Sequence, residues 1–216
     1  MIGRILCTGV LSLVAAGCAS VPAREERLLD GAGLAGWELQ TTPAARLQDV
    51  VTMKPDGVLD VAGKPAGFFA TTASFRNYRL HVEWRWTGQP GNAGVLLHVS
   101  PGAMDRVWPL SLQVQTKHGS AGDVLPMAGA TFAEPATSAP GAQPVIKART
   151  GSGSEREPGE WNSVDIVCQD GAVDVAVNGV AQNRVTKVQP SAGRIGFQLE
   201  GAPYQLRNVT LVHLAP

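Results

Sequence analysis

The chain has 216 residues, with 18 basic and 18 acidic side chains, so its formal net charge is zero, and 44% of its residues are hydrophobic. That length suits one domain with a full core, and the balanced charge, with no Lys or Arg run longer than two residues, excludes the long basic surface that nucleic-acid binding requires. The 25 glycines, 15 prolines and 17% charged residues are typical of a loop-rich β protein and exclude a disordered chain, a coiled coil and a polytopic membrane protein.

The first residues have the pattern of an export signal. Arg4 precedes an apolar run from Ile5 to Ala16, which is too short to span a bilayer and ends in small residues. The following stretch, Ala15-Ala16-Gly17-Cys18, resembles a bacterial lipoprotein cleavage site, at which the cysteine becomes the first residue and carries lipid. We therefore predict a lipoprotein signal peptide over residues 1–17. The alternative is an ordinary secretory signal cleaved nearby.

Lipid on Cys18 would anchor the protein to a membrane, because each buried CH₂ of an acyl chain contributes about 0.8 kcal/mol. Ala19 and Ser20 follow Cys18 in place of an Asp. By resemblance to sorted lipoproteins, this favours the outer membrane, with the protein facing the periplasm. Residues 18–27 are expected to form a tether, and residues 28–216 to form one domain.

Strict alternation of apolar and polar residues is the main structural signal in the rest of the chain. It is uninterrupted from Tyr78 to Trp86, as in a strand with one face in a core. Similar runs occur at Gly94–Ser100, Leu110–Thr116, Ser163–Gln169, Ala172–Asn178, Arg194–Glu200 and Tyr204–His213. The dipeptides Asp170-Gly171 and Asn178-Gly179 favour hairpin turns because both tolerate positive φ. Many short strands with Gly-rich turns predict an all-β fold, a jelly-roll β-sandwich of two antiparallel sheets.

Two further features bear on organisation. The segment 129–159 is rich in Ala, Pro, Ser, Thr and Gly and is longer than most connecting loops. It is either a functional flap over one face of the sandwich or a mobile loop. Cys168 has the parity of Val164 and Ile166, so we expect a buried strand residue rather than a nucleophile.

Three predicted strands carry polar side chains on the face opposite their apolar residues. These are His81, Glu83 and Arg85 in the first strand, Ser111, Gln113 and Gln115 in the second, and Gln198 and Glu200 in the third. Such faces can hydrogen-bond densely to the hydroxyls of a sugar. The alternative is a solvated surface with incidental cross-strand pairs. The sugar-binding interpretation requires the three faces to meet in one hollow.

A few residues outside this pattern are candidates on their own. His98 fits a sugar-binding residue and a core histidine equally well. His118 lies in a Gly-rich loop, where functional residues concentrate. Trp108 lies in a Pro-flanked loop and is the tryptophan best placed to stack on a sugar ring, whereas Trp84 and Trp86 follow core parity. The chain has no Gly-x-Ser-x-Gly, HExxH, phosphate-loop or CxxC motif, so serine hydrolases, zincins and nucleotide enzymes have no support.

Several short segments, taken in order, carry a family resemblance. They are Leu28–Gly31, Leu34–Glu38, Leu80–Trp86, Gly91–Val95, Gln115–Asp123, Pro158–Asn162, Val177–Gly179 and Gly196–Pro203 continuing to Val209. Together they resemble the 3-keto-disaccharide hydrolase family. The resemblance implies a fold similar to the concanavalin A-like lectins and glucanases and a carbohydrate ligand. The candidate substrate-binding residues are Asn92, His98, Trp108, Gln113, Gln115, Asp123 and Gln198.

One position departs from the family pattern. A Glu is expected two residues before Gln115, and this chain has Gln113 there. If that Glu supplies a proton or binds a metal in relatives, this protein must use another group or has lost activity.

The chemistry that the family implies begins at the ketone. In a 3-keto sugar the C2 proton is acidified by the adjacent carbonyl, so its removal allows the aglycone on C1 to leave, and water then adds. The site needs a base, a group that stabilises the enolate and an acid for the leaving oxygen. We expect Glu83 or Glu200 as the base, Arg85 with or without a divalent cation at the enolate, and His118 as the acid.

Other functions remain open at this point. The same Glu pair could serve an ordinary two-carboxylate glycosidase, whose stereochemistry depends on the carboxyl separation. The chain could also be a lectin-like lipoprotein that binds carbohydrate without catalysis, because fold does not fix function. A structural surface lipoprotein without a ligand is the third alternative.

Overall fold

The computed structural model describes residues 25–30 and 33–215. The predicted signal peptide over residues 1–17 and the lipidation site at Cys18 lie outside this part of the chain. The last three residues of the predicted tether form strand β1 (Glu25–Arg27), which pairs with the C-terminal strand, and the rest of it lies outside the described residues. Within the described residues, no helix is long and apolar enough to cross a membrane.

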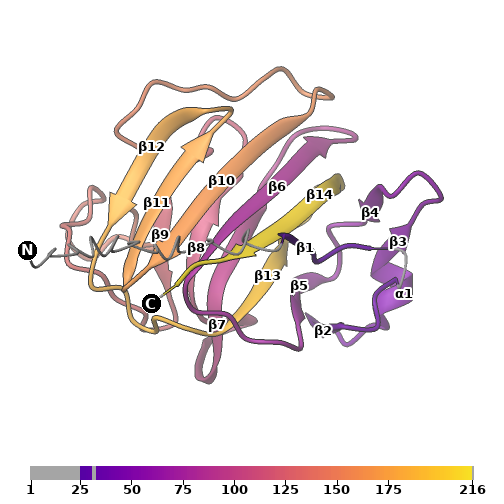
Figure 1. Ribbon diagram of the computed structural model, residues 1–216, viewed down its shortest axis with the longest axis horizontal. Coiled ribbons are helices and arrows are strands. Elements are labelled where there is room, and N and C mark those ends of the chain that lie inside the picture. The colour runs from indigo at the N-terminus through magenta and orange to yellow at the C-terminus, as the bar shows by residue number, and fades with distance from the viewer. Residues whose placement is uncertain (1–24, 31–32, 216) are drawn as a thin grey trace, which may run out of the picture.

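The domain is a sandwich of two antiparallel sheets, which confirms the predicted all-β jelly roll. One sheet has eight strands in the order β12-β11-β10-β6-β14-β4-β3, with β1 beside β14. Its other strands are β3 (Val51–Met53), β4 (Leu59–Val61), β6 (Tyr78–Trp86), β10 (Asn162–Gln169), β11 (Ala172–Val177), β12 (Val180–Val185) and β14 (Tyr204–His213). In Figure 1, β12, β11, β10, β6 and β14 lie side by side in front of the second sheet.

The second sheet has six strands in the order β2-β5-β13-β7-β8-β9. They are β2 (Trp37–Thr42), β5 (Ala66–Thr71), β7 (Gly94–Asp105), β8 (Trp108–Gln115), β9 (Val124–Met127) and β13 (Arg194–Leu199). The single short helix in the described part, α1 (Leu47–Val50), precedes β3. Both predicted turn dipeptides close hairpins with positive φ, at Asp170-Gly171 and Asn178-Gly179.

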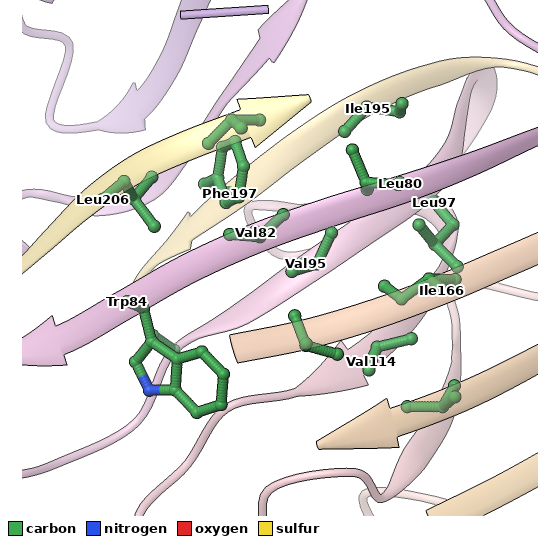
Figure 2. Close-up of a cluster of buried hydrophobic side chains, with 14 of the residues drawn as sticks. Leu80, Val82, Trp84, Val95, Leu97, Val114, Ile166, Ile195, Phe197 and Leu206 are labelled. Carbon is green, nitrogen blue, oxygen red and sulfur yellow. The ribbon is translucent and has the colours of Figure 1, made fainter. Parts of the chain in front are cut away.

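The main core fills the space between the sheets. Figure 2 shows Val82 and Trp84 of β6 in this layer, together with Val95 and Phe197 of the six-stranded sheet. Burial of these apolar side chains is the dominant stabilising contribution to such a fold. Cys168 is buried on the same side, as predicted, and burial raises the pKa of its thiol to about 12. A thiol in that state is not a nucleophile at neutral pH.

The outer face of the six-stranded sheet is also covered in part, and this distinguishes it from a simple solvated face. A second apolar cluster lies on it, formed by Phe68, Ala70, Leu96 and Val99. Strand β8 is buried on both faces along most of its length. Its cover comes from two sources, the arm at the β7–β8 turn (residues 100–109) and the segment that follows β9. These covering segments turn the face into hollows rather than a flat surface.

Candidate functional site

A hollow with a volume of about 910 Å³ lies on the six-stranded sheet. Strands β8, β9 (Val124–Met127) and β13 line it, together with the β7–β8 arm and the segment after β9. Its polar and charged lining includes Asn92, Arg106, Gln113, Lys117, Gln198 and Glu200. A hollow of this size accommodates one or two sugar rings.

A row of amides crosses the floor of this hollow and ends at a carboxylate. Gln113 donates hydrogen bonds to Gln115 and, at 3.0 Å, to Oε1 of Gln198. Gln198 in turn donates to Oε2 of Glu200 at 2.7 Å. Asn92 donates to the same oxygen, also at 2.7 Å. Side chains from β8, β13 and the loop before β7 are thereby fixed in one connected network.

Gly94 makes room for this row. Gly94 is the cross-strand partner of Gln115 on β8, and a Cβ added to it would lie 2.8 Å from Nε2 of Gln113. Any larger residue would therefore displace the amide at the centre of the network.

Two acceptors in the hollow are left for a ligand. Oε1 of Gln113 and Oδ1 of Asn92 are buried and have no hydrogen-bond partner among the described residues. A buried polar atom without a partner costs about 1–3 kcal/mol, so such atoms are usually satisfied in the functional state. Hydroxyl groups of a bound sugar are donors that could satisfy both.

Glu200 is the carboxylate at the end of the amide row, and its environment shifts its pKa. Desolvation raises its pKa, while the Asn92 hydrogen bond and the positive charges of Lys117 and Arg106 partly oppose that shift, and the net direction is upward. A carboxylate with a raised pKa accepts a proton more readily at neutral pH. Both cations line the hollow with Glu200, and Nε of Arg106 also lies 3.7 Å from Oδ1 of Asp105.

An apolar wall faces the amides. Trp108 packs with Leu125 and Met127, and Ile146 lies against this cluster. The prediction of a loop position for Trp108 is wrong, since it begins β8 and is only 7% exposed, yet it lines the hollow as a stacking residue would. The segment 129–159 takes part as well, because Gln143–Ile146 line the hollow. The flap interpretation of that segment therefore fits the structure.

The expectation that Glu83 and Arg85 share this hollow is wrong. Both side chains project from β6 on the outer face of the eight-stranded sheet, on the opposite side of the sandwich. Glu83 accepts hydrogen bonds from Arg207 at 2.6 Å and Asn208 at 2.8 Å. Desolvation acts to raise its pKa, but these hydrogen bonds outweigh it, so the net pKa is lowered.

Arg85 is likewise engaged away from the hollow. It donates to Oε1 of Gln205 at 2.6 Å and lies over the ring of Trp161, which Arg207 also covers. A guanidinium held between an amide and an indole is a surface packing arrangement. Arg85 therefore cannot stabilise an enolate at Glu200.

His118 is next to the hollow but outside it. It lines a smaller hollow of about 240 Å³, and its Nδ1 lies 3.0 Å from Oε1 of Glu155. Glu155 also accepts the backbone N–H of Gly119 at 2.7 Å and the indole N–H of Trp86. The sequence pattern did not single out Glu155, since it lies in the irregular segment before β10.

His98 and Asp123 are structural residues and not ligands of the hollow. His98 is 2% exposed, and its ring lies edge-on to Tyr78 with Nδ1 donating to the carbonyl of Pro190 at 2.9 Å. Asp123 is buried and accepts the backbone N–H of Arg149 at 2.9 Å, which fastens the segment after β9. The sequence pattern placed these residues in a strand and a loop. It could not predict that their hydrogen-bond partners are Pro190 and Arg149.

Burial of His98 makes a testable contribution to stability. Desolvation lowers its pKa from 6.5 to about 4, against the opposing effect of the Pro190 hydrogen bond. Because the folded pKa lies below the unfolded one, the contribution is complete above pH 6.5 and is lost as the pH falls toward 4. We expect the free energy of unfolding to drop by about 3 kcal/mol over that window through this residue.

Urea unfolding at pH 7 and at pH 4 would measure the effect. His98→Asn is the comparison, because Asn tolerates the positive φ of this position and does not titrate. The wild type should lose more stability than the variant between the two pH values. Equal losses would show that His98 titrates normally.

The donor set of the hollow does not favour a divalent cation. Among residues 25–30 and 33–215, no three His, Cys, Asp or Glu side chains cluster as a protein metal site requires. The hollow presents amides around Glu200 instead.

Comparison with known families assigns the chain. A sequence model of the 3-keto-alpha-glucoside-1,2-lyase-like domain matches residues 24–212. The chain belongs to this family. The match begins one residue before β1, so the family domain includes the N-terminal strand that pairs with β14. No curated protein matches the sequence.

Solved structures with the same fold include carbohydrate-active and carbohydrate-binding proteins. A proposed glycosyl hydrolase from Parabacteroides distasonis has a TM-score of 0.59 at 18% identity, covering 83% of this chain and 89% of that one. The carbohydrate-binding module CBM66 from Bacillus subtilis has a TM-score of 0.57 at 10% identity, covering 83% and 96%. The β-glucanase of Bacillus licheniformis also has a TM-score of 0.57 at 10% identity, covering 89% and 98%. At these identities the likeness shows the fold that this lyase-like family shares with them.

Proposed function

We propose that this family member cleaves 3-keto-glycosides by elimination followed by hydration, with Glu200 as the base. The observation that carries the proposal is the raised pKa of Glu200 at the end of the amide row, inside a hollow of about 910 Å³. Membership of the 3-keto-alpha-glucoside-1,2-lyase-like family supports the substrate class.

The reaction balances around that single carboxylate. Glu200 takes the proton from C2, and the electron pair of the C2–H bond moves toward the C3 carbonyl to give an enolate. The enolate expels the C1 oxygen of the aglycone, which forms the C1–C2 double bond and breaks the glycosidic bond. The leaving oxygen takes the proton back from Glu200. Water then adds across the double bond, with its hydroxyl on C1 and a proton on C2.

The neighbouring groups have separate tasks in this scheme. Lys117 and Arg106 place positive charge near the developing enolate. The unpartnered oxygens of Gln113 and Asn92 accept hydrogen bonds from sugar hydroxyls and fix the ring over the floor. Because Gln113 is neutral, Glu200 is the one carboxylate of the amide row. Glu200 would therefore supply the acid–base function that a Glu at position 113 was expected to supply.

Incubation of the protein with 3-keto-trehalose in D₂O tests the mechanism. Elimination and hydration should release 3-keto-glucose that carries deuterium at C2, observed by NMR. Trehalose without the ketone should not be cleaved, because its C2 proton is not acidic. Equal cleavage of both sugars would contradict an elimination.

A second candidate function is carbohydrate binding without turnover. The observation that favours it is Gln113, an amide that cannot exchange a proton at the position where a Glu was expected. Calorimetric titration with 3-keto-trehalose would distinguish the two functions. Saturable binding without any product favours the binding module, and turnover excludes it.

We further propose that Cys18 carries lipid and fixes the domain to the bacterial outer membrane on its periplasmic side. The support is the sequence pattern of residues 1–18. Expression in cells fed a clickable palmitate should label the wild type and not Cys18→Ser. The variant should also fractionate as a soluble exported protein, and labelling of both forms would contradict the proposal.

A further inference from the structure

A second hollow lies on the same sheet face, on the other side of the β7–β8 arm. Its volume is about 710 Å³, and its walls are mainly apolar. Its lining includes Phe68 of β5, Val99 and Met104 of β7, and Pro109 of β8, with Arg194 of β13 at the edge. Met104 is 41% exposed, one of only two large hydrophobic side chains in the described chain that are exposed to this degree.

This apolar hollow adjoins the hollow of Glu200 directly. Phe68 is the cross-strand partner of Gln198, which hydrogen-bonds Glu200. Along the outer face of β13, only Gly196 lies between Arg194 in one hollow and Gln198 in the other. Four residues of a strand span roughly 13 Å, about the length of a sugar ring with an attached ring system.

The arm is shared by both hollows. Met104 faces the apolar one, whereas Asp105 and Arg106 line the other. A molecule that spans the two would therefore contact polar groups at one end and apolar groups at the other.

We propose that the apolar hollow binds the aglycone of the substrate, and that it favours an aromatic or similarly apolar ring system over a second sugar. This inference rests on the proposed function, in which C1 and its aglycone lie beside Glu200. A second sugar would need buried hydrogen-bonding groups, whereas Phe68 and Val99 form the buried part of this hollow and its polar lining, Gln40, Ser74 and Ser100, is not buried. Arg194 is already paired with Glu38 at 2.7 Å, so the edge offers little free charge.

The test compares two 3-keto-glucosides, one with a methyl and one with a 2-naphthyl aglycone. Wild-type protein should show at least a tenfold higher kcat/KM for the naphthyl compound. Met104→Glu should reduce that preference at least fivefold. Val180→Glu is the matched control, because Val180 is similarly exposed, at 39%, but lies on β12 of the other sheet. It should behave as the wild type.

A second measurement separates this inference from the proposed function. Binding of 2-naphthol alone, followed by its fluorescence, requires no turnover and should weaken at least fivefold in Met104→Glu but not in Val180→Glu. Cleavage of both glycosides with equal efficiency in all three proteins, or naphthol binding unaffected by Met104→Glu, would overturn the inference. If naphthol binds as expected but neither glycoside is cleaved, the apolar site stands and the proposed reaction fails.

Discussion

Glu200→Gln should lower kcat for 3-keto-glycoside cleavage by about 10²- to 10⁴-fold, the range typical of loss of a general base. The side chain keeps its size and can still accept hydrogen bonds from Asn92 and Gln198, so the amide row stays in place. Substrate affinity, measured by calorimetry on the inactive protein, should therefore change little. The result would separate proton transfer from binding.

Glu83→Gln is the matched control for that experiment. The two carboxylates lie on opposite faces of the sandwich, and the pKa of Glu83 is lowered whereas that of Glu200 is raised. Activity should remain within about twofold of the wild type. A large loss in Glu83→Gln together with an active Glu200→Gln would place the chemistry on the eight-stranded sheet and refute the proposed site.

Trp84→Ala should destabilise the fold by about 3–5 kcal/mol, the cost typical of removing a large aromatic side chain from a core. Trp84 is 1% exposed and lies on the inner face of β6. Its backbone neighbour across the ladder is Asn162, directly after Trp161, whose ring lies on the outer face under Arg85 and Arg207. Substitution of Trp84 and of Trp161 therefore compares the contributions of the inner and outer faces of one sheet to stability.

Trp161→Ala should cost only about 1–2 kcal/mol, because it removes two partly exposed cation–π contacts of roughly 0.5–1 kcal/mol each. Urea unfolding followed by circular dichroism would measure both variants. Equal losses in the two variants would mean that the division into core and surface faces described here is incorrect.

Regular alternation made much of the fold predictable. β6 and β14 begin and end where the sequence pattern placed them, because each has one face in the core and one toward solvent or a neighbour. The strands between residues 37 and 71 were missed. β3 and β4 have three residues each, too few to establish a period, and β5 is buried on both faces, so its sequence does not alternate.

The candidate site was predictable only in part, for a geometric reason. Alternation tells which side chains point away from the core, and it correctly grouped Gln113, Gln115 and Gln198. It does not tell which sheet a strand joins. The outer faces of two packed sheets point in opposite directions, so Glu83 could not be separated from Glu200 without the strand order.

Strand β1 also bears on how the domain would sit at a membrane. It begins at Glu25, so if Cys18 is lipidated, only residues 19–24 bridge the lipid and the first hydrogen-bonded residue, a reach of roughly 20 Å at full extension. β1 joins the eight-stranded sheet, whereas the Glu200 hollow opens on the other sheet. So short a linker would keep the eight-stranded sheet close to the bilayer. The Glu200 hollow would then open toward the aqueous compartment.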